Sequence, residues 1–267
     1  MQKKRKTKIK PKKKLDQHFL VSNYVGRKFS QLVCKYRKLI EIGAGTGFLT
    51  KHVLKCRSLE LLATIEIDDD LITELWFQHT YDPRVLPLLS DALYPSLKLE
   101  YFDAAYGSIP YSITGPLLSL LAKTFRKPAV LLLQREVAQR LAANPGSSEY
   151  GRLTVLVRLV YKIKLHNVVP PTAFRPPPKV YSQIVELLPH SDIPSVSAVE
   201  KVESLTRCMF SERRKLAYKV ARKCLERVGV SIDRLPVDLT SKRVYELSED
   251  IFLALSLIGS DSSEAST

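Results

Sequence analysis

The sequence has few cysteines, and those it has lack the spacing of a metal site. Cys34, Cys56, Cys208 and Cys224 form no C-x-x-C pair, and the five histidines are scattered without ligand spacing. We therefore expect no zinc or other metal and no disulfides. A reducing interior follows as the default environment.

Long apolar runs are also missing. No segment approaches the roughly 20 apolar residues that a membrane-spanning helix needs. Residues 1–14 lack the apolar core of a signal peptide. We expect a protein with no membrane partner that stays in the cytoplasm.

Acidic residues are in short supply. Asp and Glu number 27 against 42 Lys and Arg, a net charge of +15. Nine of the basic residues lie before Leu15 with no acid among them, which leaves +6 on the rest of the chain. A basic arm on a basic body indicates a polyanionic partner, most commonly nucleic acid. The alternative is that the charge serves solubility.

The stretch Leu39–Thr50 (LIEIGAGTGFLT) is the motif on which the prediction of the fold and of the site is based. A short apolar run, three alternating glycines and an amphipathic segment from about Thr46 predict a buried parallel strand, a tight turn and a helix. The dinucleotide pattern G-x-G-x-x-G/A requires Gly or Ala where this chain has Phe48. The spacing E-x-G-x-G-x-G resembles the first motif of S-adenosylmethionine-dependent methyltransferases. A plain glycine turn and a nucleotide site remain alternatives.

Two acids follow the next strands. Leu59–Ile67 predicts a second strand, and Glu66 lies 21 residues beyond Gly45, the spacing of an acid that accepts from ribose hydroxyls. The alternative is a solvated acid before the helix Leu71–Gln78, whose N-terminus Asp68–Asp70 suit. Val85–Leu89 predicts a third strand, after which Asp91 is placed to accept from an adenine amine.

Further strands alternate with helices. Phe102–Tyr106 predicts a strand leading into the turn Ser108–Tyr111, and Ala129–Leu133 predicts another before the helix Glu136–Ala142. We expect an α/β fold, a Rossmann-like, doubly wound, mainly parallel sheet. Ligands bind such sheets at the carboxyl ends of the strands, where the glycines, both acids and this turn converge.

The remainder of the chain predicts the end of the sheet and then a helical C-terminal domain. We expect a helix over Leu153–Tyr161, a stiff extended loop over Val168–Val180 and a last strand over Ser182–Leu188. A linker at Pro189–Pro194 leads into a smaller all-helical domain. Lys201–Arg227 holds nine basic and three acidic residues. Its cluster Arg213, Arg214 and Lys215 indicates an RNA-contacting surface or a solvated helix face.

The chain resembles the ribosomal RNA adenine dimethyltransferases, which dimethylate two adjacent adenosines near the end of small-subunit RNA. The likeness runs from about Leu15 to Ile258 and looks archaeal or eukaryotic in type. It rests on these segments, in order: Gln17–Leu20, Glu41–Thr50, Glu66, Ser90–Ala92, Ile109–Tyr111, Gln134–Leu141, Tyr150–Leu153, Pro170–Val180 and Phe210–Lys215.

The resemblance implies a role for each matching residue. S-adenosyl-L-methionine would be bound by Gln17, His18, Leu20, Gly43, Gly45, Glu66, Asp91, Ala92 and Ser108. The target base would be presented by the turn Ser108, Ile109, Pro110 and Tyr111, with Tyr111 stacked on one face and Phe174 on the other. Small-subunit ribosomal RNA, within the immature subunit, would be the partner of a monomeric enzyme.

From the composition along the chain, we expect three parts. These are a basic disordered arm over residues 1–14, a methyltransferase domain over residues 15–190 and a helical RNA-binding domain over residues 191–267.

One position departs from the family. The family has Asn at the first position of the Asn-Leu/Ile-Pro-Tyr turn, and this chain has Ser108. A hydroxyl also offers lone pairs to the adenine amine, on a shorter arm, so we expect Ser108 to tune the rate without abolishing it. Two alternatives stay open: an RNA-binding assembly factor that has lost turnover, and an adenine methyltransferase acting on large-subunit RNA.

Overall fold

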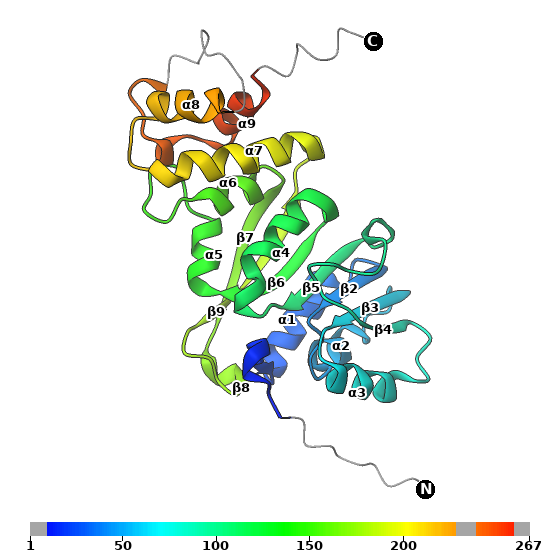
Figure 1. The fold of residues 1–267 in the computed structure, drawn as a ribbon. Coiled ribbons are helices and arrows are strands. Elements are labelled where there is room, and N and C mark those ends of the chain that lie inside the picture. Colours follow the sequence, from blue (N-terminus) through cyan, green and yellow to red (C-terminus); the bar gives the residue numbers. More distant parts are fainter. Residues whose placement is uncertain (1–9, 228–238, 259–267) are drawn as a thin grey trace, which may run out of the picture. The chain divides into compact units, whose positions relative to one another are not determined.

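The structure is a computed structural model that describes residues 10–227 and 239–258 of the chain (Figure 1). Contacts divide the chain into two compact units that alternate along the sequence. Unit 1 comprises Met1–Leu117, Lys127–Arg135 and Leu165–Glu186, and unit 2 comprises Leu118–Arg126, Glu136–Lys164 and Leu187–Thr267. The boundary expected at residue 190 stays a prediction.

A seven-stranded sheet has the order β4-β3-β2-β5-β6-β9-β7. Its strands are β2 (Lys38–Ile42), β3 (Leu61–Glu66), β4 (Val85–Leu89), β5 (Ala104–Ser108), β6 (Ala129–Gln134), β7 (Tyr161–Val169) and β9 (Ser182–Pro189). The pairs β4–β3, β3–β2, β2–β5 and β5–β6 are parallel. The predicted doubly wound, mainly parallel sheet is confirmed, and the strand order reverses between β2 and β5.

Two helices cover one face of this sheet in unit 1. Helix α1 (Asn23–Val33) packs beside α2 (Phe48–Val53) and also contacts β5 and β6. Alternate strand residues join them in one buried core: Leu39, Leu62, Ala104, Tyr106, Val130 and Leu132. Because both faces of a parallel sheet are covered, these strands read as nearly continuous apolar runs.

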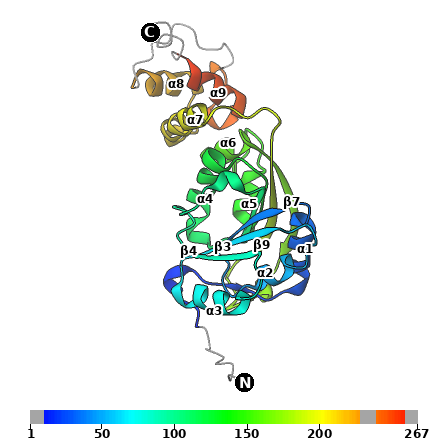
Figure 2. The ribbon, with the colours of Figure 1, turned by 90° about the vertical axis from the view of Figure 1, so that its right-hand side faces the viewer.

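Helix α3 (Asp69–His79) begins at the carboxyl end of β3 and contacts β3 and β4 (Figures 1 and 2). Asp68 is its N-cap and accepts from the backbone N–H of Asp70. Asp69 and Asp70 occupy the first turn, where negative charge complements the helix dipole. The role expected for Asp68–Asp70 at a helix N-terminus is confirmed.

A second, two-stranded sheet ties the beginning of the chain to a distant loop. Strand β1 (Phe19–Leu20) pairs antiparallel with β8 (Phe174–Arg175), which follows the short 3₁₀ turn Pro171–Ala173. Part of the segment expected as a stiff loop is therefore a strand.

Among the described residues, the α-helices that lie wholly or mainly in unit 2 are α5 (Arg135–Leu141), α6 (Arg152–Arg158), α7 (Val196–Met209), α8 (Ala217–Glu226) and α9 (Glu249–Leu257). Helix α4 (Thr114–Leu120) precedes them and begins in unit 1. Helix α7 contacts α6, α8 and α9 (Figure 2). The predicted helical C-terminal region is confirmed for its described residues; residues 228–238 and 259–267 lie outside them.

Two expectations for local structure are wrong. The helix expected to reach Tyr161 ends at Arg158, and Tyr161 begins β7. Apolar and basic residues alternate over Tyr161–Leu165, which is the period of a strand. The loop expected from Val168 therefore begins after Val169.

The expectation of unpaired cysteines is also wrong. Disulfides join Cys34 to Cys56 and Cys208 to Cys224, with Cα–Cα distances of 5.1 and 5.9 Å. The partners lie 22 and 16 residues apart, so each pair depends on two helices packing together and no local spacing reveals it. This pairing removes the ground for inferring a reducing interior from cysteine usage.

Within the described part of the chain, no helix is both long and apolar enough to cross a membrane.

Candidate functional site

A cavity lies in unit 1 where β2, β3, β4 and β5 end. Its lining includes every residue predicted for the cofactor or the target base except Leu20: Gln17, His18, Gly43, Gly45, Glu66, Asp91, Ala92, Ser108, Ile109, Pro110, Tyr111 and Phe174. Leu20 is 4% exposed and packs in the core beneath α1 and α2. The structure thus brings residues from six separated segments around one space.

The glycine turn forms one wall of this cavity. Gly43 and Gly45 have φ angles of +67° and +55°, a region in which a side chain is strained. The turn stays close to β3 because the N–H of Gly43 donates to the carbonyl of Ile65 at 2.9 Å. Main chain is therefore exposed to a ligand where β2 ends.

Glu66, the last residue of β3, is 7% exposed and lines the same cavity. One carboxylate oxygen accepts from the N–H of Gly45 at 2.8 Å, and the other accepts from the N–H groups of Ile67 and Asp68. Burial raises the pKa of Glu66, and these hydrogen bonds oppose the rise. The carboxylate joins the glycine turn to α3 and retains lone pairs for a ligand hydroxyl.

Asp91 and Ala92 follow β4 and complete this side of the cavity. An Asp91 carboxylate oxygen accepts from the N–H of Leu93 at 2.9 Å, which fixes the turn after the strand.

The turn after β5 forms the opposite wall. Ser108 is the last residue of the strand, and Ile109 donates from its N–H to the carbonyl of Leu132 at 3.1 Å. The Tyr111 hydroxyl lies 2.9 Å from the Ser182 hydroxyl. Burial raises the pKa of Tyr111. The Tyr111 ring is therefore held at its tip, and its hydroxyl stays neutral near pH 7.

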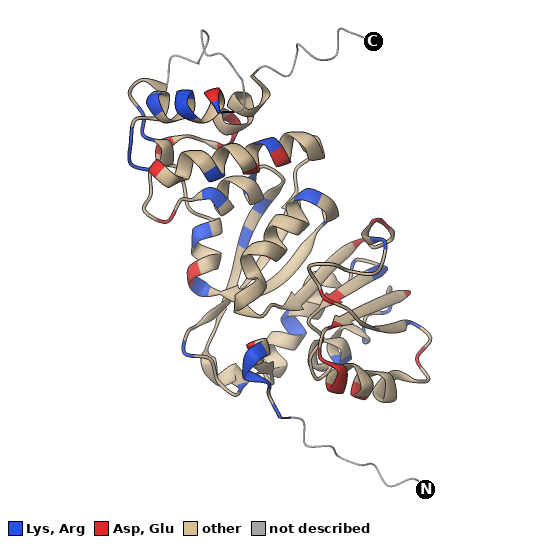
Figure 3. Ribbon diagram, in the orientation of Figure 1, with Lys and Arg blue, Asp and Glu red and all other residues tan. Residues whose placement is uncertain are grey.

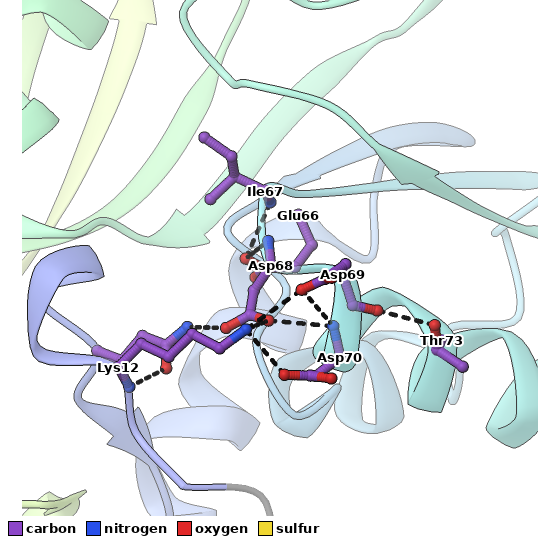
Figure 4. A network of polar contacts seen from close by, with 8 residues as sticks. Lys12, Glu66, Ile67, Asp68, Asp69, Asp70 and Thr73 are labelled. Atoms are coloured by element: carbon purple, nitrogen blue, oxygen red, sulfur yellow. Dashed lines mark hydrogen bonds and ion pairs between the residues drawn. The ribbon is translucent and has the colours of Figure 1, made fainter.

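The segment preceding β1 lies against this cavity and forms a polar network that sequence analysis missed (Figure 4). The Lys12 ammonium contacts the carboxylates of Asp68, Asp69 and Asp70 at 2.6, 3.2 and 2.8 Å. Gln17 donates from its amide nitrogen to Asp68 at 2.6 Å. The basic segment and the acidic start of α3 are thus in contact through their side chains.

Asp68 is the centre of this network and is 3% exposed. Burial raises its pKa, but hydrogen bonds from Lys12 and Gln17 outweigh burial and leave the pKa lowered. Residues 10–14 of the expected disordered arm are thus part of the described structure, with Lys13–Leu15 in a 3₁₀ turn; residues 1–9 lie outside it. The signal available in the sequence was the pairing of a lysine run with three consecutive acids.

Glu41, the acid at the start of the glycine motif, has a structural role. It is 1% exposed and accepts from the hydroxyls of Thr50 at 2.6 Å and Tyr106 at 2.9 Å. Because it joins β2, β5 and α2, it fixes the strand and helix that flank the turn. Burial raises its pKa from 4.5 to about 7, against the effect of both hydrogen bonds.

We predict that Glu41→Gln changes the pH dependence of stability. Since the pKa is raised in the folded state, native protein loses stability as pH rises from 4.5 to about 7. The glutamine variant does not ionise here, so its free energy of unfolding minus that of the native protein should increase by up to about 3 kcal/mol from pH 5 to pH 8. Urea unfolding of both proteins at the two pH values measures this; an identical difference at both would contradict it.

The predicted RNA-contacting residues lie in unit 2. The guanidinium of Arg213 donates to the carbonyls of Ser148 and Tyr150 at 3.0 and 2.9 Å, and it lies 5.5 Å from the ring centre of Tyr245. The known contacts of Arg213 are therefore internal. Arg214 and Lys215 are exposed, and Lys215 pairs with Glu212.

Helix α8 carries further basic residues in the same unit (Figure 3). The side chains of Lys219, Arg222 and Lys223 are exposed. The role of this surface in RNA binding stays a prediction, with Arg214 and Lys215 better placed for it than Arg213.

A parallel sheet with this strand order, a positive-φ glycine turn and an acid at the end of the neighbouring strand are the features expected of an S-adenosylmethionine-dependent methyltransferase. The sequence pattern of the family described as "Ribosomal RNA adenine dimethylase" matches residues 8–238. The chain belongs to this family, whose cofactor is S-adenosylmethionine.

Curated relatives agree. The chain is 38% identical over 237 residues to a probable ribosomal RNA small subunit methyltransferase A of Pyrobaculum islandicum, covering 89% of this chain and 91% of the relative. It is 34% identical over 263 residues to the ribosomal RNA small subunit methyltransferase A of Thermosynechococcus vestitus, covering 93% and 96%.

Solved structures are similar over the same length. A dimethyladenosine transferase from Plasmodium falciparum superposes with a TM-score of 0.73 at 28% identity, covering 89% of this chain and 96% of that one. The 23S rRNA methyltransferase ErmE superposes with a TM-score of 0.60 at 22% identity, covering 89% and 98%, and this likeness concerns the fold alone.

Proposed function

We propose that this protein transfers methyl groups from S-adenosylmethionine to two adjacent adenosines near the end of small-subunit ribosomal RNA, forming N6,N6-dimethyladenosine. One observation carries the proposal: the glycine turn, Glu66 and Asp91 line the same cavity as the turn Ser108–Tyr111. One cavity can then hold a methyl donor and an unstacked adenine together.

The residues of the cavity fit the cofactor. Gly43 and Gly45 leave main chain open to its methionine part. The buried carboxylate of Glu66 suits its ribose hydroxyls, and Asp91 with Ala92 suits its adenine. Gln17 and His18 also line the cavity, on the segment anchored to Asp68. When bound, S-adenosylmethionine supplies a methyl group that is already electrophilic, so the methyl group itself needs no further activation by the protein.

The protein's task is to prepare the adenine amine, whose lone pair is delocalised into the ring. Tyr111 would stack on the base, and Phe174 would contact its other face. Ser108 and a main-chain carbonyl of the turn would accept from the amine hydrogens and draw the nitrogen towards a tetrahedral geometry. As the new N–C bond formed, the bond from the methyl group to the sulfonium sulfur would break and leave a neutral thioether. Positive charge would develop on the nitrogen until it lost a proton, and the neutral Tyr111 ring would stabilise that charge.

The partner we propose is small-subunit RNA within the immature subunit, met in the cytoplasm by a monomer. The net charge of +15 and the exposed Arg214, Lys215 and α8 residues support electrostatic binding to RNA.

Methyl transfer from labelled cofactor tests the proposal. The full chain is incubated separately with immature small subunits, with large subunits and with naked small-subunit RNA. We expect label in adenosine of the small subunits. Label confined to large-subunit RNA would instead indicate the large-subunit enzyme. No label, under conditions where cofactor and RNA both bind, would favour the assembly factor.

We predict that Ser108→Ala slows the reaction by about fivefold, the cost of roughly one neutral hydrogen bond. The second methylation should suffer more, because a monomethylated amine has only one hydrogen left to donate. Ser108→Asn should match or exceed the native rate where the longer amide fits. Single-turnover reactions with mono- and dimethyladenosine resolved by mass measure this; unchanged rates for both steps in Ser108→Ala would exclude Ser108 from the reaction.

A further inference from the structure

Asp16 lines the cavity, and none of the roles described above includes it. Its carboxylate accepts from the backbone N–H of Tyr111 at 3.0 Å, across 95 residues of sequence. Its other oxygen lies 3.8 Å from the Nε2 of His18. The side chain therefore joins the segment before β1 to the turn that presents Tyr111.

Inside the turn, Ile113 and Thr114 donate to the carbonyl of Pro110, and Asp16 adds an acceptor for the N–H of Tyr111. Pro110 has no N–H, and Ile109 donates to Leu132 on β6. Tyr111 begins the short 3₁₀ helix Tyr111–Ile113, and Pro110 at its N-cap gives no side-chain hydrogen bond. Asp16 thus supplies from a distant segment the cap that local sequence omits, and a carboxylate suits a helix N-terminus.

The backbone at Asp16 is held in an unusual state. Its φ and ψ are +51° and +39°, the left-handed region, where glycine is unstrained and Asp is tolerated. The N–H of Asp16 donates to the carbonyl of Lys13 at 3.1 Å, which closes the 3₁₀ turn before it. This conformation places the carboxylate at Tyr111 while the neighbouring Gln17 donates to Asp68.

We propose that Asp16 is a positioning residue for the target base. It holds the N–H of Tyr111, and thereby the ring whose tip meets Ser182, in the orientation that stacks on adenine. Because Lys12 and Gln17 anchor the same segment beside Glu66, the segment links the ribose side of the cavity to the base side. The inference rests on the proposed function for its consequence in catalysis, but the contact itself is independent of it.

Two substitutions separate positioning from folding. Asp16→Gly removes the cap and relieves the left-handed backbone, so its melting temperature should not fall. Asp16→Asn keeps an acceptor oxygen on the same arm and loses the charge. We expect Asp16→Gly to slow single-turnover methylation by about ten- to a hundredfold, as small misplacements of reacting groups do. Asp16→Asn should restore the rate to within about threefold, and cofactor affinity should change little in both.

Amide hydrogen exchange at Tyr111 supplies a readout that needs no turnover. Exchange should be faster in Asp16→Gly than in the native protein and slow again in Asp16→Asn. Hydrogen exchange at Tyr111 that is as slow in Asp16→Gly as in the native protein would overturn the proposal. Methylation that is as slow in Asp16→Asn as in Asp16→Gly would also overturn it. If the native protein itself gives no product, the proposed function fails, and the exchange result still decides whether Asp16 holds the turn.

Discussion

Tyr111→Ala should slow methyl transfer by roughly a hundredfold. The ring provides stacking worth about 1–3 kcal/mol per base and a cation–π contribution of about 0.5–2 kcal/mol as charge develops on the amine. The substitution removes both, while Glu66 and Asp91 on the other side of the cavity remain. Cofactor affinity should therefore change much less than the rate.

Two further variants make this prediction specific. Tyr111→Phe keeps the ring and loses only the hydroxyl that meets Ser182, so its rate should fall by no more than a few-fold. Tyr101→Ala removes a tyrosine that is 62% exposed and outside the cavity lining, and it should leave the rate unchanged. Single-turnover rates at saturating cofactor compare the three. A Phe variant as slow as the Ala variant would give the essential role to the hydroxyl.

Glu66→Ala should weaken cofactor binding by about 1–3 kcal/mol, because a ribose hydroxyl and three backbone N–H groups lose their acceptor. Titration calorimetry with S-adenosylhomocysteine measures this. Glu74→Ala on the outer part of α3 is a matched control, since Glu74 does not line the cavity.

A ligand lacking one ribose hydroxyl separates the loss of the hydrogen bond to ribose from the loss of the hydrogen bonds to the backbone N–H groups. The native protein should bind the 2′- or 3′-deoxy analogue more weakly than the parent ligand, and Glu66→Ala should bind the two more nearly alike. Equal discrimination in both proteins would show that Glu66 only holds the turn together.

The sheet was predictable because its signals are local. Val85–Leu89 has the bounds expected, and the strand, turn and helix around Gly43–Gly47 follow from apolar patterning and glycine spacing alone. Strand β7 was also within reach, because Tyr161–Leu165 alternates at period two. It was missed because the apolar helix before it was extended too far.

The convergence of the site was predictable for a topological reason. Parallel strands bring their carboxyl ends to one edge, so residues after four strands meet without any knowledge of side-chain packing. The contacts of Lys12, Asp16 and Gln17 were not predictable in this way. They depend on β1 pairing with β8, a two-residue ladder between segments more than 150 residues apart.

Local charge did not predict the partners of two basic side chains. Lys12 belongs to a run expected to bind RNA, yet its ammonium contacts three carboxylates within the protein. Arg213 belongs to a basic cluster, yet its guanidinium donates to main-chain carbonyls. Charge identifies a class of partner, whereas the partner of each side chain depends on which opposite groups the fold brings near.

The product on small-subunit RNA tests the central claim most directly. RNA from a single-turnover reaction with immature small subunits is digested, and methylated nucleosides are identified and located by mass. We predict N6,N6-dimethyladenosine at two adjacent positions near the RNA end, formed by the native protein and nearly absent with Tyr111→Ala. Unmethylated adenosine at both positions, with cofactor and RNA demonstrably bound, would contradict the claim.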